Sequence, residues 1–291
     1  SADGRYVAFQ SEARLTSEDT NNVSDIYVRD RQASTTVLVS VGIAGAAAIS
    51  ASYNAAISAD GRFVAFDSFA DNLVPGDANG HRDVFLRDLY AGTTSLVSLS
   101  SGGAQADGRA YDSSISADGR FILYTAEARS LVADSGNTGS DLYLRDMQEG
   151  TTVRVVHTST GDPTTGGNAY GAISTTGRYI AFVSVSPDLV GEQAAGAFLL
   201  DRESGLTTLV SVPISGTLGR DVYLNPCVSP DGRYVAFTSS STDLVPNDTN
   251  GYYDVFLRDS VAGTTERISI GNDGAQANQP SDNASISADG R

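Results

Sequence analysis

The chain has 291 residues, of which 40% are hydrophobic and 30 are glycines. Its 35 acidic residues outnumber its 19 basic ones, which gives a formal net charge of −16 and a sequence pI of about 4.3. A chain this acidic is expected to repel nucleic acid and anionic membrane surfaces and to attract cations.

One motif, Ser-x-x-Gly-Arg, recurs along the whole chain at almost constant spacing. Its copies begin at Ser1, Ser58, Ser116, Ser174, Ser229 and Ser287. The chain is therefore predicted to consist of five tandem repeats of roughly 58 residues, and a period of this length is typical of repeat architectures such as propellers.

Each repeat is predicted to contain four short strands. In the second repeat they cover Arg62–Ser68, Asp83–Asp88, Thr94–Leu99 and Tyr111–Ser116, which are rich in β-branched and aromatic residues. Asp-Gly before the first of these strands and Gly-Thr-Thr before the third are hairpin signals. Four antiparallel strands per repeat predict an all-β fold, a β-propeller, with residues 1–291 forming one domain of five blades.

The chain opens and closes in the middle of a repeat. It begins with the second strand of a blade, Arg5–Gln10, and ends with a first-strand sequence, Ala284–Ser287. The C-terminal strand is therefore predicted to complete the first blade beside strands two to four from the N-terminus, which would close the ring. The alternative is six or more blades in a longer chain, and we expect the sequence to be part of a larger protein.

The segments SADGRYVAF, SPDGRYVAFTS and DVFLRD resemble the WD-like repeats of the TolB-like β-propeller family. The resemblance covers essentially the whole chain. It implies a periplasmic, cell-surface or extracellular bacterial propeller, often used for protein interactions. The family usually has six blades of shorter repeats, so the longer repeats here depart from its pattern.

A loop between the second and third strands of each blade, counted from the innermost strand, carries Asp-x-Asn-x-x-x-Asp or a close variant in four repeats. Its oxygen-bearing side chains are Asp19, Asn21 and Asp25; Asp77, Asn79 and Asp83; Asp134, Asn137 and Asp141; and Asp248, Asn250 and Asp254. Calcium takes six to eight oxygen ligands from such flexible loops, so calcium is the predicted cofactor. The alternative is an Asx-turn, in which Asp and Asn bond the backbone and no metal is needed.

Tyrosines lie just before or within the predicted innermost strand of four repeats, at Tyr53, Tyr111, Tyr170 and Tyr223. If innermost strands face a central channel, these side chains could ring one mouth of it. A tyrosine combines a flat apolar face with a hydroxyl, which suits binding of a sugar or a peptide. The alternative is that the rings pack between blades.

Catalytic residues do not stand out from the repeat pattern. His81 and His157 occupy different repeat positions, and Cys227 has no histidine near it in sequence. The sequence therefore predicts no enzyme activity but a non-catalytic extracellular binding or structural propeller, with a protein or glycan partner and no nucleic acid or membrane insertion. The alternatives are a lectin-like propeller that binds carbohydrate and, third, a polysaccharide hydrolase or lyase.

Overall fold

The computed structural model of the chain describes residues 1–133, 139–190, 195–216, 223–287 and 289–290. Almost all of its regular structure is antiparallel β-sheet, with one three-stranded and four four-stranded sheets. The chain divides into two compact units, of which the first holds β1 to β11 and the second β12 to β19. Each unit is described by itself.

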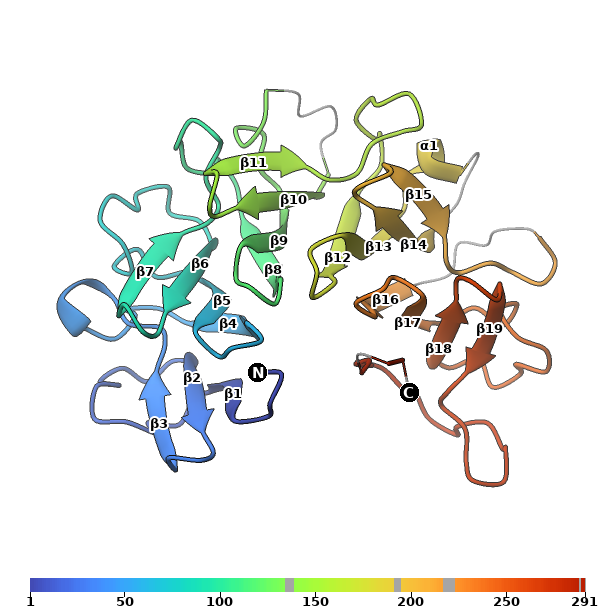
Figure 1. Cartoon of the computed structure of the whole chain (residues 1–291), viewed down its shortest axis with the longest axis horizontal. Helices are drawn as coiled ribbons and strands as arrows, with labels where there is room; N and C mark the ends of the chain where they lie inside the picture. Colours follow the sequence, from blue (N-terminus) through green and yellow to red (C-terminus); the bar gives the residue numbers. More distant parts are fainter. Residues whose placement is uncertain (134–138, 191–194, 217–222, 288, 291) are drawn as a thin grey trace. The chain divides into compact units, whose positions relative to one another are not determined.

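The first unit contains three blades, whose strands follow one another in chain order across each sheet (Figure 1). The strands are β1 Tyr6–Ser11, β2 Asp25–Asp30 and β3 Thr35–Leu38; β4 Ser52–Ile57, β5 Phe63–Ser68, β6 Asp83–Asp88 and β7 Thr93–Leu96; and β8 Ala110–Ile115, β9 Phe121–Ala126, β10 Asp141–Asp146 and β11 Thr151–Arg154. A short 3₁₀ turn covers Ile43–Gly45.

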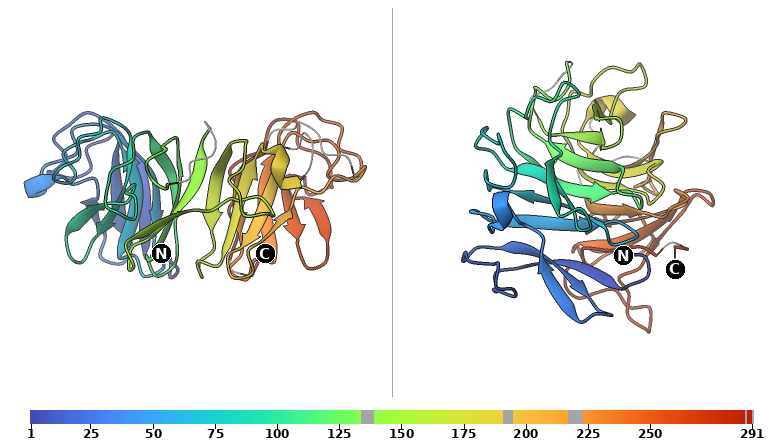
Figure 2. Two further views of the ribbon diagram at one scale, coloured as in Figure 1. Left: turned by 90° about the horizontal axis from the view of Figure 1, so that it is seen from above. Right: turned by 60° about the vertical axis from the view of Figure 1, so that its left-hand side comes forward.

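The second unit contains two blades with the same strand order. The elements are β12 Asn168–Ile173, β13 Tyr179–Ser184, α1 Pro187–Val190, β14 Gly196–Asp201 and β15 Leu206–Leu209; and β16 Tyr223–Val228, β17 Tyr234–Ser239, β18 Asp254–Asp259 and β19 Thr264–Arg267. Within each blade, neighbouring strands are antiparallel and are joined by hairpins and loops at their ends (Figure 2). No helix in the described part of the chain is long and apolar enough to span a bilayer.

The predicted strands of the second repeat agree closely with the observed ones. The third strand of that blade, β6, has the predicted bounds, and the others shift by one to three residues at an end. The largest shift is at β7, which ends at Leu96 rather than Leu99. There the chain leaves the sheet, and Leu99 instead forms an isolated bridge with Gln105.

In the first unit, apolar side chains on the two faces of the middle sheet pack against the two neighbouring blades. In β5, Val64 and Phe66 join a core cluster with Ile26 and Val28 of the first blade. Ala65, which points to the other face, joins a cluster with the third blade instead. This alternation follows from the two-residue period of a strand and explains why the sequence needs an apolar residue at nearly every position there.

An ion pair between two motifs recurs in all five blades. The Arg of Ser-x-x-Gly-Arg binds the Asp that ends the third strand of the same blade, as in Arg62–Asp88 (2.6 Å). The other pairs are Arg5–Asp30, Arg120–Asp146, Arg178–Asp201 and Arg233–Asp259, at 2.6–2.7 Å. Each Asp therefore pairs with the distant hairpin Arg rather than with the Arg beside it in sequence.

The predicted closing strand does not form. Residues 280–287 contain no strand, and the first sheet has only three strands within the described ranges. The segment nevertheless keeps features of the other innermost strands, because Asn283 has a φ of 55° and the Ser281 N–H donates to the Tyr253 carbonyl oxygen (2.8 Å). It lacks the backbone bonds to a second strand that would make it part of a sheet.

Candidate functional site

The predicted calcium loops are held together by hydrogen bonds within the protein. In the first blade, Asn21 Nδ2 donates to Asp25 Oδ2 (2.8 Å) and to the carbonyl oxygen of Ala48 (2.8 Å). Asn21 Oδ1 accepts the backbone N–H of Val23 (2.9 Å), which closes an Asx-turn. The other oxygen of Asp25 accepts the hydroxyl of Ser40 (2.6 Å).

The second and fifth blades repeat this arrangement. Asn79 Nδ2 donates to Asp83 Oδ2 (2.6 Å), and Asn250 Nδ2 donates to Asp254 Oδ2 (2.9 Å). In all three blades the Asn directs its N–H, rather than its oxygen, at the carboxylate, so the arrangement fits the Asx-turn alternative. No group of three or more His, Cys, Asp and Glu side chains in the described residues is placed to hold a metal ion. Calcium at these loops therefore stays a prediction that this geometry does not support.

The remaining loop residues have separate partners. Asp19 accepts the Tyr27 hydroxyl, Asp77 accepts from Gln105 Nε2 (3.3 Å), Asp248 pairs with Arg267 (3.1 Å) and Asp141 pairs with Arg154 (3.4 Å). Asp134 and Asn137 lie outside the described residues. In the third and fifth blades, an arginine at the end of the fourth strand, buried at Arg154 and half-buried at Arg267, thus supplies the positive charge beside the loop carboxylates.

The four predicted ligand-binding tyrosines occupy three different positions of the innermost strands. Tyr53 and Tyr111 are second in β4 and β8, Tyr170 is third in β12, and Tyr223 is first in β16. Tyr223 is buried and packs against Phe237 of its own blade, whereas Tyr170 is exposed. The structure brings Tyr53 and Tyr111 together.

Each innermost strand contains a β-bulge at its third residue. The φ angle there is positive at Asn54 (55°), Asp112 (54°), Tyr170 (50°) and Asn225 (45°), and the pairing register shifts at the same point. Asn and Asp tolerate this left-handed conformation better than most residues. In the first unit, the bulge lets Asn54 Nδ2 donate to Asp112 Oδ1 of the next blade (2.7 Å).

A buried ion pair that was not predicted from the sequence lies beside these bulge residues. Asp67 is fully buried, and Arg82 donates to Asp67 Oδ2 from Nε (2.6 Å) and also binds it through NH2. Asp67 Oδ1 accepts from Asn54 Nδ2 (3.2 Å) and from the Asp112 backbone N–H (3.1 Å). Burial raises the pKa of Asp67 to about 6, although Arg82 and the hydrogen bonds lower it.

The sheet topology explains why these residues meet. Tyr53 of β4 is the register partner of Asp67 of β5, and Ser68 of β5 is the partner of Asp83 of β6. The start of β4, the end of β5 and the residue before β6, Arg82, therefore share one end of the sheet. The innermost strands β4 and β8 are neighbours, which adds the third blade's residues to the same place.

Three aromatic rings surround the guanidinium group of Arg82. Its Cζ lies 5.0 Å from the ring centroid of Tyr53 and 5.6 Å from those of Phe69 and Tyr111, within cation–π range. Phe69 is 47% exposed, so this cage reaches the surface. We refer to the following seven residues as the Arg82 cluster: Tyr53, Asn54, Asp67, Phe69, Arg82, Tyr111 and Asp112.

The Arg82 cluster offers hydrogen-bond acceptors next to aromatic faces. Two of the guanidinium nitrogens of Arg82 are engaged by Asp67, so that charge is already neutralised. Asn54 is exposed and Asp112 is half-buried. Neither Asn54 Oδ1 nor Asp112 Oδ2 has a hydrogen-bond partner among the described residues. Burial also raises the pKa of Asp112, although Arg82 lowers it. This arrangement suits a ligand that donates hydrogen bonds and has an apolar face.

The signal that could have revealed the ion pair is a departure from the repeat. Among the five blades, Asp67 is the only acidic residue at the fifth position of the second strand. Arg82 is the only basic residue that directly precedes the third strand of a blade. The other blades have Gln10, Thr125, Val183 and Thr238 at the position of Asp67, and Ser24, Ser140, Ala195 and Tyr253 at that of Arg82. Because both residues differ from the other copies, the pattern that the repeats share does not predict them.

No protein-family model matches the sequence, and no curated protein matches it. Among solved structures, a putative TolB from Agrobacterium tumefaciens is similar at a TM-score of 0.55 and 21% identity, over 92% of this chain and 77% of that one. TolB from Acinetobacter baumannii is similar at a TM-score of 0.51 and 17% identity, over 84% of this chain and 48% of that one. This chain therefore spans about half the length of that TolB. An oligogalacturonate lyase from Vibrio parahaemolyticus is similar at a TM-score of 0.56 and 12% identity, over 94% of this chain and 66% of that one.

These likenesses confirm the predicted TolB-like β-propeller fold, and they correct the predicted function. We predicted a non-catalytic binding or structural propeller, but the structures that share the fold include an enzyme, the lyase, as well as TolB. The prediction of a non-catalytic protein, which rested on the lack of a recognisable catalytic constellation, is therefore not supported, because the same fold also carries an enzyme. An oligogalacturonate lyase of similar fold has been solved in complex with manganese, which concerns a divalent metal but not calcium.

Proposed function

We propose that this chain binds a neutral or amino sugar at the Arg82 cluster. The observation that carries the proposal is the pair of unengaged acceptors, Asn54 Oδ1 and Asp112 Oδ2, beside the rings of Tyr53, Phe69 and Tyr111. Sugar hydroxyl or ammonium groups would donate to the acceptors, and the C–H face of the sugar would pack on an exposed ring such as Phe69.

The charge of the cluster favours such sugars over uronates. Arg82 is paired with Asp67, while Asp112 and the nearby Glu127, which accepts the Tyr111 hydroxyl (3.2 Å), add negative charge. A carboxylate ligand would meet hydrogen-bond acceptors and the like charge of these two carboxylates there. The ligand is therefore proposed to differ in charge from the oligogalacturonate named for the structurally similar lyase.

The proposal includes a periplasmic or extracellular location, in agreement with the resemblance to TolB-like propellers. The similar lyase shares only the fold with this chain, so it offers a precedent for carbohydrate chemistry on such a scaffold and no residue correspondence.

Binding is tested by calorimetric titration with cello-oligosaccharides, chitosan oligosaccharides and oligogalacturonates. The proposal predicts saturable binding to at least one of the first two and none to the third. Asn54→Gly is the informative variant, because glycine accepts the φ of 55° and only the side chain is lost. We expect it to weaken binding at least tenfold.

Asn225→Gly is the matched control. Asn225 has the same bulge conformation, and its Nδ2 donates to Asn283 Oδ1 (2.7 Å) as Asn54 donates to Asp112. It lies outside the Arg82 cluster, so its loss should leave the affinity unchanged. Equal losses in both variants, or binding of the uronate alone, would contradict the proposal.

A second candidate function is acid–base chemistry on the bound sugar, with Asp112 as the reacting carboxyl group. Its raised pKa and its half-buried position at the edge of the cluster favour a role in proton transfer. Asp112→Asn keeps the shape and the oxygen that accepts from Asn54, but it replaces the free acceptor by a donor, so it should weaken binding and, at saturating sugar, abolish turnover of any oligosaccharide that the wild-type protein cleaves. Unchanged turnover in Asp112→Asn would exclude this role.

A further inference from the structure

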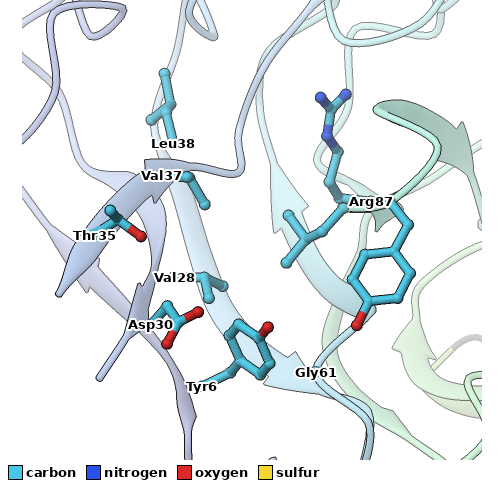
Figure 3. A pocket seen from close by; sticks show the side chains of 10 residues that line it. Tyr6, Val28, Asp30, Thr35, Val37, Leu38, Gly61 and Arg87 are labelled. Atoms are coloured by element: carbon cyan, nitrogen blue, oxygen red, sulfur yellow. The ribbon is translucent and has the colours of Figure 1, made fainter. Parts of the chain in front are cut away.

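A pocket lies between the first and second blades of the first unit, away from the Arg82 cluster. Its volume is about 370 Å³, which is at the small end of the range for small-molecule sites. Tyr6, Val37 and Leu38 of the first blade line it, together with Arg87, Leu89 and Tyr90 of the second. Figure 3 shows Arg87 across the cavity from Val37 and Leu38, with Tyr6 and Gly61 at the opposite end from Leu38. We call it the interblade pocket.

The walls of the interblade pocket are mainly apolar, and its mouth is open to solvent. Leu38 is buried, whereas Val37 is 44% exposed and Tyr90 is 67% exposed. A ligand could therefore enter past Val37 and Tyr90 without any rearrangement of the blades. Such a wall suits a hydrocarbon chain or an aromatic ring.

The acidic residue at the pocket, Asp30, is already neutralised. Arg5 donates to both of its carboxylate oxygens, at 2.6–3.1 Å, and the backbone N–H groups of Gln32 and Ala33 donate to Oδ1 (2.9 Å each). These contacts hold the pKa of Asp30 well below its usual range. Asp30 therefore neither attracts a cation into the pocket nor repels an anion strongly.

Arg87 is the uncompensated charge of the pocket. Its NH1 donates to Thr94 Oγ1 (3.0 Å), and its Nε is buried with no hydrogen-bond partner among the described residues. Burial lowers the pKa of the Arg87 guanidinium, although the group stays protonated because its ordinary value is so high. An anion beside it would offset this cost of burial.

The matching arginine of the third blade shows what Arg87 lacks. Arg145 NH1 also donates to its own threonine, Thr152 (3.1 Å), and in addition to the carbonyl oxygen of Ser100 in the preceding blade (3.2 Å). The threonine hydroxyl donates to the preceding blade in both cases, from Thr94 to the Val41 carbonyl oxygen (3.1 Å) and from Thr152 to that of Leu99, but no hydrogen bond from Arg87 to the first blade is found among the described residues. Arg87 thus keeps donor capacity at the wall of a cavity.

We propose that the interblade pocket binds a small amphipathic carboxylate, with its carboxylate on Arg87 and its apolar part between Val37, Leu38 and Leu89. The charge-assisted hydrogen bonds to Arg87 supply orientation, and the burial of the apolar part supplies most of the affinity. The net negative charge of the chain is screened over about 8 Å at physiological ionic strength, so the local guanidinium dominates. This site is independent of the sugar site proposed above.

The test is titration of the whole chain with benzoate and octanoate, followed by NMR or calorimetry, with benzyl alcohol and octanol as uncharged probes. Saturable binding of at least one carboxylate, at least tenfold tighter than that of its alcohol, is the expected result. Arg87→Gln should abolish that preference. Arg258→Gln, at the same repeat position in the fifth blade, should preserve it, since Arg258 NH1 likewise donates to a threonine, Thr265 (3.0 Å).

Val37→Trp provides a second variant that does not depend on Arg87. Val37 is exposed, so a larger side chain there fills the mouth of the pocket without entering the core. It should abolish binding of both carboxylates and leave the melting temperature within a few degrees of wild type. No binding to the wild-type protein at millimolar concentration, or binding that persists in both Arg87→Gln and Val37→Trp, would overturn the proposal.

Discussion

The ring of Tyr6 in the first blade lies directly on Gly61, in the hairpin of the second. A Cβ at Gly61 would overlap the ring, and the backbone of Gly61 has a φ of +75°. The same contact joins Phe63 to Gly119 in the next pair of blades. The glycine of the repeated motif is thus required both for its backbone conformation and for the close approach of neighbouring blades.

We therefore expect Gly61→Ala to lower the free energy of unfolding by about 2–4 kcal/mol, as the sum of a left-handed alanine and an overpacked contact. Chemical denaturation measures this. Gly80→Ala is the control, because Gly80 has a φ of +68° and a Cβ added there would have no atom of the described residues within 4 Å. It should cost only about 1 kcal/mol. Similar losses in both variants would show that the ring contact contributes little.

Arg82→Gln should destabilise the protein in a pH-dependent way. Removal of the guanidinium leaves the buried carboxylate of Asp67 without its counter-charge, which costs about 3 kcal/mol at pH 7. The pKa of Asp67, already about 6, should rise further, so protonation relieves part of the penalty as the pH falls to 5. Denaturation at the two pH values measures the difference.

Arg62→Gln serves as the comparison for this ion pair. The Arg62–Asp88 pair lies at the surface, where the arginine side chain is 41% exposed, so its loss should cost less than about 1 kcal/mol. If Arg82→Gln were equally mild, or if its effect did not diminish at pH 5, Asp67 would not be ionised at neutral pH in the way that we infer.

The strands were predictable because the signals that define them are local. β6 has the predicted bounds, since DVFLRD is an apolar run closed by polar residues at both ends. The adjacent Arg and Asp of that segment do not pair with each other, because a strand directs adjacent side chains to opposite faces. Asp88 consequently pairs with Arg62, the residue just before the neighbouring strand β5.

The Arg82 cluster could not be predicted from local pattern, because it depends on which strand ends meet. Asp67 and Arg82 are separated by a long loop, and Asp112 belongs to another blade. The positive φ of Asn54 also has no sequence signature as strong as a glycine. The predicted tyrosines differ in environment for a related reason: a shift of one position along the innermost strand sends Tyr223 into the core of its unit, while Tyr53 stays at the Arg82 cluster.

The Asp-x-Asn loops were ambiguous because the same side chains serve an Asx-turn and a calcium site. Asn79→Asp distinguishes the two. Without metal, it replaces the N–H that faces Asp83 and the carbonyl oxygen of Ala106 by a second carboxylate, so we expect a loss of about 2–3 kcal/mol through repulsion and a lost hydrogen bond. Melting curves recorded in EDTA and in calcium should both show this destabilisation of Asn79→Asp.

Asn22→Asp is the control for the added charge, because Asn22 is exposed and lies outside the proposed ligand set. It should change the melting temperature little in either buffer. A calcium-dependent rescue of Asn79→Asp, absent from Asn22→Asp, would contradict the Asx-turn interpretation and support calcium binding at these loops.

Asp83→Asn should reveal the cost of ionising a buried loop carboxylate. Burial raises the pKa of Asp83 to about 6, above its ordinary value in the unfolded chain, although hydrogen bonds from Ser98 and Asn79 lower it. The protonated form therefore stabilises the fold at low pH, and this contribution is lost as the pH rises through about 6. Asparagine cannot ionise, so its destabilising effect should be larger at pH 5 than at pH 7, by about 1 kcal/mol. Because His81 lies nearby, the comparison is made in a His81→Asn background for both proteins. A difference of the opposite sign would show that Asp83 is stabilised as the carboxylate, as expected if a cation occupied the loop.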